Sequence, residues 1–127
     1  MNLEKVVFGF FIVLAMTLNF GFFIGDLHRP ELHNLWELFA AIVVNLIATV
    51  LKFGDRTQIG AVHLATSLVA DLQLIAAAVV WAFAVHVWGT GMTGETMAAI
   101  VSLSGGAFLA NVMSVTILII ETVMYRR

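Results

Sequence analysis

A single aspartate inside a long apolar stretch is the strongest chemical signal in the sequence. Asp71 lies about ten residues into an apolar run that extends from about residue 61 to residue 88, which places it about 15 Å from the start of a helix. An ionised aspartate at the centre of a bilayer costs at least about 2.5 to 3.5 kcal/mol, so such a residue is protonated, paired or hydrated. We therefore predict an ion or proton site at Asp71. The alternative is an aspartate that holds neighbouring helices together through hydrogen bonds.

Further polar residues recur at helical spacing around this aspartate. His63, Ser67 and Asp71 are four residues apart and share one side of a helix, so they predict a polar stripe that leads from one membrane surface to the midplane. The simpler structural alternative is that the Ser67 hydroxyl donates a hydrogen bond to a carbonyl group of its own helix and that His63 packs in a helix interface.

The last apolar run carries a second polar face. Its members are separated by 7, 3 and 7 residues and are Ser104, Asn111, Ser114 and Glu121. Counting residues from the chain end places Asn111 and Ser114 at about the depth of Asp71, and Asn45 reaches a similar depth. We expect a midplane cluster of these groups, within one chain or between copies. The complete predicted ion or proton path is Asp71, Ser67, His63, Asn45, Asn111, Ser114 and Glu121, although Glu121 has a simpler alternative role as a partner of Arg126 and Arg127.

Small residues at four-residue spacing predict close helix packing. One pair is Gly21 with Gly25, and a second series is Ser102, Gly106 and Ala110, continued by Ser114. Such patterns let helix backbones approach each other in a membrane. They require no ligand.

The sequence favours no catalytic or metal centre. His28, His33 and Glu37 are near one another in the first loop, and imidazole and carboxylate are competent metal ligands. Their spacing matches no metal motif, so we interpret this segment as a solvated acidic loop. No serine, histidine and acid set has interpretable spacing. We therefore predict no catalytic residues, no metal and no cofactor, and a protein that is not an enzyme.

Long apolar runs provide the elements that position these groups. Four transmembrane helices are expected, over about 6–25, 36–53, 61–88 and 97–125, within one domain that comprises residues 1–127. The connections are short, which predicts an all-α antiparallel bundle. Five of the six Lys and Arg residues fall on the side of the termini, so both termini are expected in the cytoplasm.

Composition agrees with an integral membrane protein. The 127 residues are 61% hydrophobic and 11% charged, and the mean hydropathy is +1.03. A formal net charge of −2 offers no basic surface for nucleic acid. The chain has no cysteine, which excludes disulfides and thiolate chemistry.

These observations predict a small channel or transporter subunit that moves a cation or proton past Asp71. We expect a location in a bacterial-type inner membrane, with the lipid bilayer and further copies of the same chain as partners, because four packed helices leave little room for a wide aqueous path. The alternative function is a non-transporting accessory or assembly subunit of a larger membrane complex.

Overall fold

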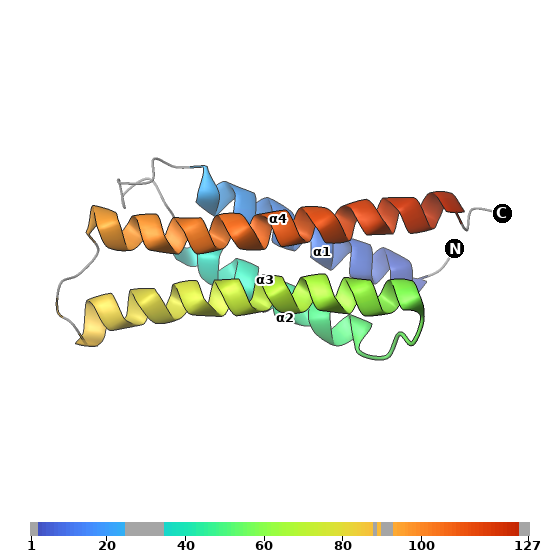
Figure 1. Cartoon of the computed structure of the whole chain (residues 1–127), viewed down its shortest axis with the longest axis horizontal. Coiled ribbons are helices and arrows are strands. Elements are labelled where there is room, and N and C mark those ends of the chain that lie inside the picture. Colours follow the sequence, from blue (N-terminus) through green and yellow to red (C-terminus); the bar gives the residue numbers. More distant parts are fainter. Residues whose placement is uncertain (1–2, 25–34, 88, 90–92, 125–127) are drawn as a thin grey trace.

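The computed structural model is all-helical over the residues that it describes, which are 3–24, 35–87, 89 and 93–124. The helices are α1 (Leu3–Phe23), α2 (Leu35–Lys52), α3 (Gln58–Ala82) and α4 (Gly94–Met124), and a π-helical segment, η2 (Phe83–Val87), continues α3 (Figure 1). No strand occurs within the described ranges. The predicted all-α class is confirmed.

Threonine side chains determine where the last two helices begin. The Thr57 hydroxyl accepts a hydrogen bond from the Gly60 amide at 2.9 Å, and the Thr93 hydroxyl accepts one from the Thr96 amide at 3.1 Å. These contacts satisfy amide groups that have no partner inside a helix. Both helices therefore begin a few residues before the apolar runs that predicted them.

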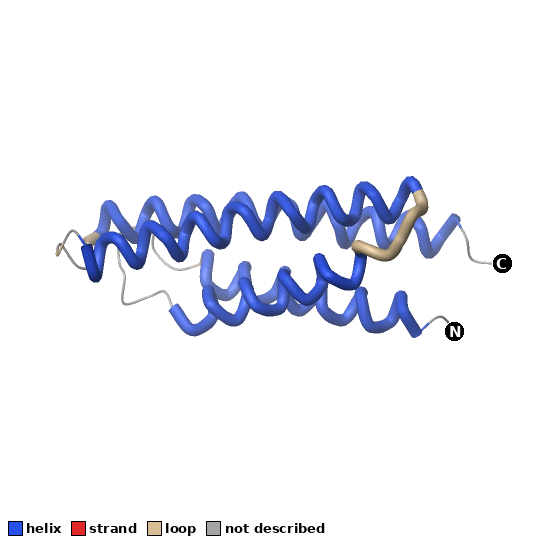
Figure 2. The backbone as a smooth tube through the Cα atoms, turned by 90° about the horizontal axis from the view of Figure 1, so that it is seen from below, coloured by secondary structure: helices blue, strands red, loops and turns tan. Residues whose placement is uncertain are grey.

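Every helix packs against two others. Contacts join α1 to α2, α2 to α3, α3 to α4 and α4 to α1, and the two views show all four helices extending along the long axis (Figures 1 and 2). The start of α1, the end of α2, the start of α3 and the end of α4 lie at the same end of the molecule (Figure 1). We call this the charged end, because Lys5, Lys52, Asp55 and Glu121 gather there; the opposite end is the far end.

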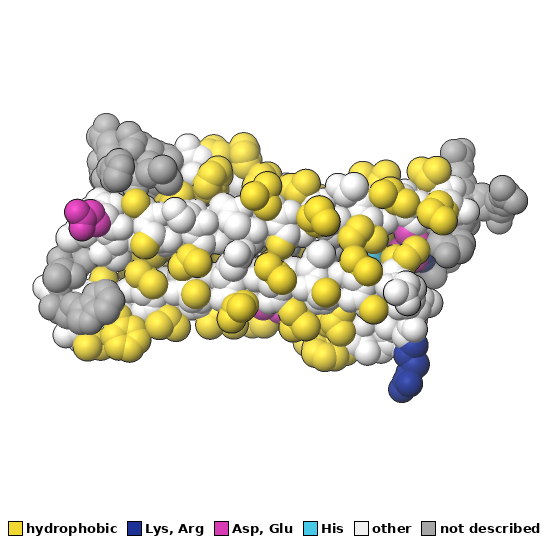
Figure 3. All heavy atoms as spheres, in the orientation of Figure 1, with side chains coloured by type: hydrophobic (Ala, Val, Ile, Leu, Met, Phe, Trp, Pro, Cys, Tyr) yellow, Lys and Arg dark blue, Asp and Glu magenta, His cyan; other side chains and the backbone are white. Residues whose placement is uncertain are grey.

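Three of the helical segments are long and apolar enough to cross a membrane. They are α1 with 21 residues, α3 with η2 at 30 residues, and α4 with 31 residues. The 18-residue α2 is not one of these three; at the helical rise it measures about 27 Å, and its crossing stays a prediction. Large apolar side chains cover much of the outer surface, over the full length of the visible face (Figure 3). Such a surface suits hydrocarbon.

The interior changes character between the two ends. The larger core is fully apolar and occupies the half towards the far end; its biggest side chains are Phe22, Leu38, Leu74, Met97, Ile100 and Val101. A smaller core of Phe8, Ile12 and Ala48 occupies the other half. Most of the buried polar side chains share this second half, because they lie between Asp71 and the charged end along their helices.

Candidate functional site: a buried polar column

Asp71 is held by two side chains of α2. It is 7% exposed. The Asn45 amide donates to Oδ1 of Asp71 at 2.5 Å, and Oγ1 of Thr49 lies 2.6 Å from Oδ2. Both contacts link neighbouring helices within one chain. Of the three partners expected for Asp71 from the sequence, Asn45 is one of these two, and Thr49 was not expected.

The Thr49 hydroxyl has two neighbours but a single hydrogen. Its oxygen also lies 2.9 Å from the carbonyl oxygen of Asn45 in the same helix. When Asp71 is ionised, Thr49 donates to its carboxylate. When Asp71 is protonated, Asp71 donates to Thr49, and Thr49 donates to the Asn45 carbonyl. The same heavy-atom arrangement therefore hydrogen-bonds both forms of the aspartate.

Asn45 links Asp71 to the preceding turn of α3. The Asn45 amide nitrogen donates a second hydrogen bond to the carbonyl oxygen of Ser67 at 3.2 Å. Both of its hydrogens are thus used, while its side-chain oxygen has no hydrogen-bond partner among the described residues. The hydroxyl of Ser67 is also buried without such a partner in the described part of the chain.

Nearer the charged end, His63 joins α3 to α4. Its Nδ1 lies 2.9 Å from the Ser114 hydroxyl, and its Nε2 lies 3.8 Å from Oε1 of Glu121. The other carboxylate oxygen of Glu121 pairs with Lys5 of α1 at 2.8 Å. The fully buried His63 ring packs in a T-shaped arrangement with the Phe8 ring, and the ring centroids are 5.0 Å apart. Glu121 thus stands between a buried imidazole and a partly exposed ammonium.

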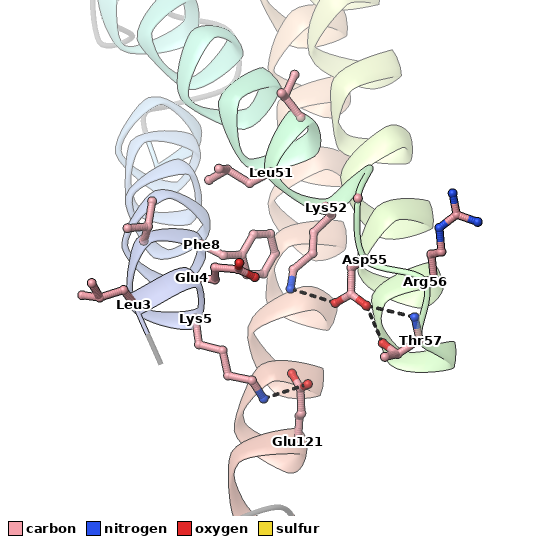
Figure 4. A pocket seen from close by; sticks show the side chains of 13 residues that line it. Leu3, Glu4, Lys5, Phe8, Leu51, Lys52, Asp55, Arg56, Thr57 and Glu121 are labelled. Carbon is pink, nitrogen blue, oxygen red and sulfur yellow. Dashed lines mark hydrogen bonds and ion pairs between the residues drawn. The ribbon is translucent and has the colours of Figure 1, made fainter. Parts of the chain in front are cut away.

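A pocket of about 880 Å³ opens at the charged end beside Glu121. Lys5, Lys52, Asp55 and Glu121 line it together with apolar side chains of α1 and α2 (Figure 4). Nζ of Lys52 lies 3.5 Å from Asp55 and 4.3 Å from the centre of the Phe8 ring. Glu121 can therefore be reached from the charged end through a pocket that is lined partly by charged side chains.

Asp55 is fixed by the turn between α2 and α3. Its Oδ1 accepts hydrogen bonds from the Thr57 hydroxyl at 2.7 Å and from the Thr57 amide at 2.9 Å. The hydroxyl bond is the largest cause that holds the pKa of Asp55 below its ordinary value, followed by the amide bond, and the nearby Lys52 charge also favours ionisation. The turn thus carries a stable negative charge next to the pocket.

The predicted face on α4 is buried, but none of the hydrogen bonds of Asp71 within the described residues comes from it. Ser114 contacts His63 instead, because α4 extends further than α3 at the charged end and residue counting from the end of α4 overestimated its depth. Asn111 is fully buried, and neither its oxygen nor its nitrogen has a hydrogen-bond partner in the described ranges. Ser104 lies further towards the far end, where its hydroxyl donates to Asn19 at 3.4 Å.

Among the described residues, Glu121 pairs with Lys5 of α1. Arg126 and Arg127, the partners considered from the sequence, lie outside the described residues, as do His28 and His33 of the first loop. Thr49 was missed by sequence reasoning, although its four-residue spacing from Asn45 places both on one face of α2.

The small-residue positions have different surroundings. Gly106 lies against the Gln73 side chain of α3, and Gly21 lies against the Glu37 side chain of α2, so side chains occupy the space above both glycines. Ala110 packs on the larger apolar core. Ser102 is exposed, and Gly25 lies outside the described residues.

These contacts, together with the fully buried Asn111 one turn from Ser114 on α4, define a buried polar column. From the charged end inwards its residues are Glu121, His63, Ser114, Ser67, Asn111, Asn45, Thr49 and Asp71. All eight are at least nine-tenths buried. At Asp71 the column meets the apolar core that fills the half of the bundle towards the far end.

A family model for a family of unknown function, DUF6394, matches residues 32–122. The chain belongs to the DUF6394 family. No curated protein and no solved structure matches it. The segment matched by the DUF6394 model contains all eight residues of the polar column, whereas Lys5 and Asn19 of α1 precede it.

Proposed function

We propose that this protein is a small membrane transporter or channel subunit that moves a proton past Asp71. The observation that carries the proposal is the hydrogen bonding of Asp71. Thr49 lies within hydrogen-bond distance of both the carboxyl group and the Asn45 carbonyl, so it supports the ionised and the protonated aspartate alike. A site that exchanges a proton needs this property, since a buried polar group without a partner is costly in either state.

The other residues of the column are better suited to the transfer of a proton than to the passage of a larger cation. The hydroxyl of Ser114, the imidazole of His63 and the carboxylate of Glu121 follow one another towards the pocket at the charged end. These groups both accept and release protons or hydrogen bonds. A proton that passes between them requires no pore wide enough for a hydrated ion.

The proposed setting is an antiparallel four-helix bundle in which α2 also crosses the bilayer. The charged end, which carries Lys5, Lys52 and Arg56, faces the cytoplasm because positive residues are retained on that side. Both termini are then cytoplasmic, and the proposed location is a bacterial-type inner membrane. The column lies inside one chain, and the homo-oligomer predicted from the sequence is a further part of the proposal.

Proton flux into liposomes that contain only this protein tests the function. A pH-sensitive dye inside the vesicles reports flux driven by a potassium diffusion potential, for wild type and for Asp71→Asn. The variant keeps the size and hydrogen bonding of the side chain but cannot exchange its proton. We expect wild-type flux well above that of empty vesicles and loss of at least tenfold in the variant.

Asp55→Asn is the matched control, because it removes a carboxylate at the charged end that lies outside the column. Its flux should equal that of wild type, and all three proteins should show the same oligomer by light scattering. If wild type is folded and silent, the transport proposal fails. The accessory-subunit alternative then applies, and the search turns to a partner complex.

A further inference from the structure

Six buried polar atoms of the column have no hydrogen-bond partner among the described residues. They belong to five side chains and are Ser67 Oγ, Asn45 Oδ1, both polar atoms of the Asn111 amide, His63 Nε2 and Glu121 Oε1. Leaving one buried donor or acceptor without a partner costs more than a typical hydrogen bond contributes. Six together would offset much of the marginal stability of a small domain. Something else therefore hydrogen-bonds to them.

These atoms lie at two adjacent levels. His63 of α3 meets Ser114 of α4. One turn further from the charged end, α3 carries Ser67 and α4 carries Asn111, which lie about 4.5 to 6 Å deeper at the helical rise. Asn45 lies at that same level, because its amide bonds to the Ser67 carbonyl. The unpartnered atoms thus form an inner group beside Asp71 and an outer group at His63 and Glu121.

We infer that water molecules bound inside the helix bundle fill these two levels and connect Glu121 to Asp71. The inner group mixes unpartnered oxygens with the Asn111 amide nitrogen, which needs an acceptor. Water supplies both a donor and an acceptor, whereas a dehydrated metal cation would leave the nitrogen without a partner. At the outer level, the 3.8 Å between His63 and Glu121 is too long for a direct hydrogen bond and is a separation that a bridging water serves.

The water path has one open side. Glu121 lines the pocket at the charged end, so water enters from there. Beyond Asp71 the interior is filled mainly by fully buried apolar side chains, among them Leu74, Phe22 and Leu38, and apolar sites of this kind stay dry. Asn19 and Ser104 are also buried there and bond to each other, and Nδ2 of Asn19 has no hydrogen-bond partner among the described residues. Asp71 therefore exchanges its proton with the charged end in this conformation, and each bound water accepts one proton as it releases another.

This inference deepens the proposed function, on which the role of the water in proton movement depends, while the water itself is tested without transport. The probe is ordinary water in a nuclear magnetic resonance experiment on the full chain in nanodiscs. We expect cross-peaks between water and the side-chain amide hydrogens of Asn45 and Asn111. Their absence from the folded wild-type protein overturns the inference, whatever the flux.

Asn111→Leu is the informative variant, because it replaces the amide by an apolar group of similar size. The water cross-peak at Asn45 should disappear, and proton flux in liposomes should fall at least tenfold. Ser104→Ala is the matched control: it removes a buried hydroxyl from the same face of α4, beyond Asp71 from the charged end, and should leave both readings unchanged. A cross-peak at Asn45 that persists in Asn111→Leu contradicts the path. Hydration without any wild-type flux would keep the bound water but remove the proposed function.

Discussion

At the scale of single residues, the chemistry depends on Thr49. Its hydroxyl oxygen lies 2.6 Å from Asp71 in a buried site, so Thr49→Val removes the partner while it keeps the shape of the side chain. We expect the free energy of unfolding to fall by about 1 kcal/mol, in the range of hydrogen bonds between membrane helices. Reversible unfolding in mixed detergent micelles measures this change.

Thr116→Val provides the comparison for Thr49. Thr116 is exposed and bonds to the Val112 carbonyl of its own helix at 2.8 Å, so its hydroxyl contributes no contact between helices. The free energy of unfolding should change by less than about 0.5 kcal/mol, as for a surface substitution. Equal losses in the two variants would show that the contact with Asp71 adds nothing.

At the scale of helices and turns, the connection between α2 and α3 predicts a dependence on pH. Asp55 is stabilised as a carboxylate by the Thr57 hydroxyl, so its folded pKa lies below the ordinary value of 3.8. A lowered pKa in the folded state adds stability that is complete above the unfolded pKa and is lost as the pH falls through the folded one. Wild type should therefore exceed Asp55→Asn in stability by a constant amount at pH 5 to 7, and the difference should shrink below pH 3.8.

Unfolding midpoints of both proteins between pH 3 and pH 7 test this expectation. The same comparison should be made in a Thr57→Val background, which removes the hydroxyl that is the largest cause of the shift. In that background, the stability lost through Asp55→Asn should depend less on pH. An unaltered pH profile there would assign the effect to another group.

Helices and their buried faces could largely be predicted from the sequence, because apolar length and four-residue spacing are local properties. The spacing of His63, Ser67 and Asp71 predicted that the three share one side of a helix, and all three are buried in α3. The contact between Ser114 and His63 could not be obtained in this way. It depends on how far α4 slides along α3, which packing across the whole interface determines. Thr49 was missed for a similar reason, since its importance comes from the rotation of α2 towards Asp71.

At the scale of the whole molecule, the membrane topology depends on whether α2 crosses the bilayer. The three longer helical segments can each cross a membrane by length and composition. If α2 also crosses, the end of α1 and the start of α4 face one side, and the turn between α2 and α3 faces the other. If α2 does not cross, the end of α1 and that turn lie on the same side.

The absence of cysteine makes this choice testable with single substitutions. Ile24→Cys reports the end of α1, Arg56→Cys reports the turn, and Thr93→Cys reports the start of α4, and all three positions are exposed. With a maleimide that cannot cross the membrane, added to intact cells, we expect labelling at positions 24 and 93 and protection at position 56. Permeabilised cells serve as the control, because there all three should react. Labelling of positions 24 and 56 from the same side would show that α2 does not cross, and Asp71 would then lose the membrane-spanning partner helix on which the proton site depends.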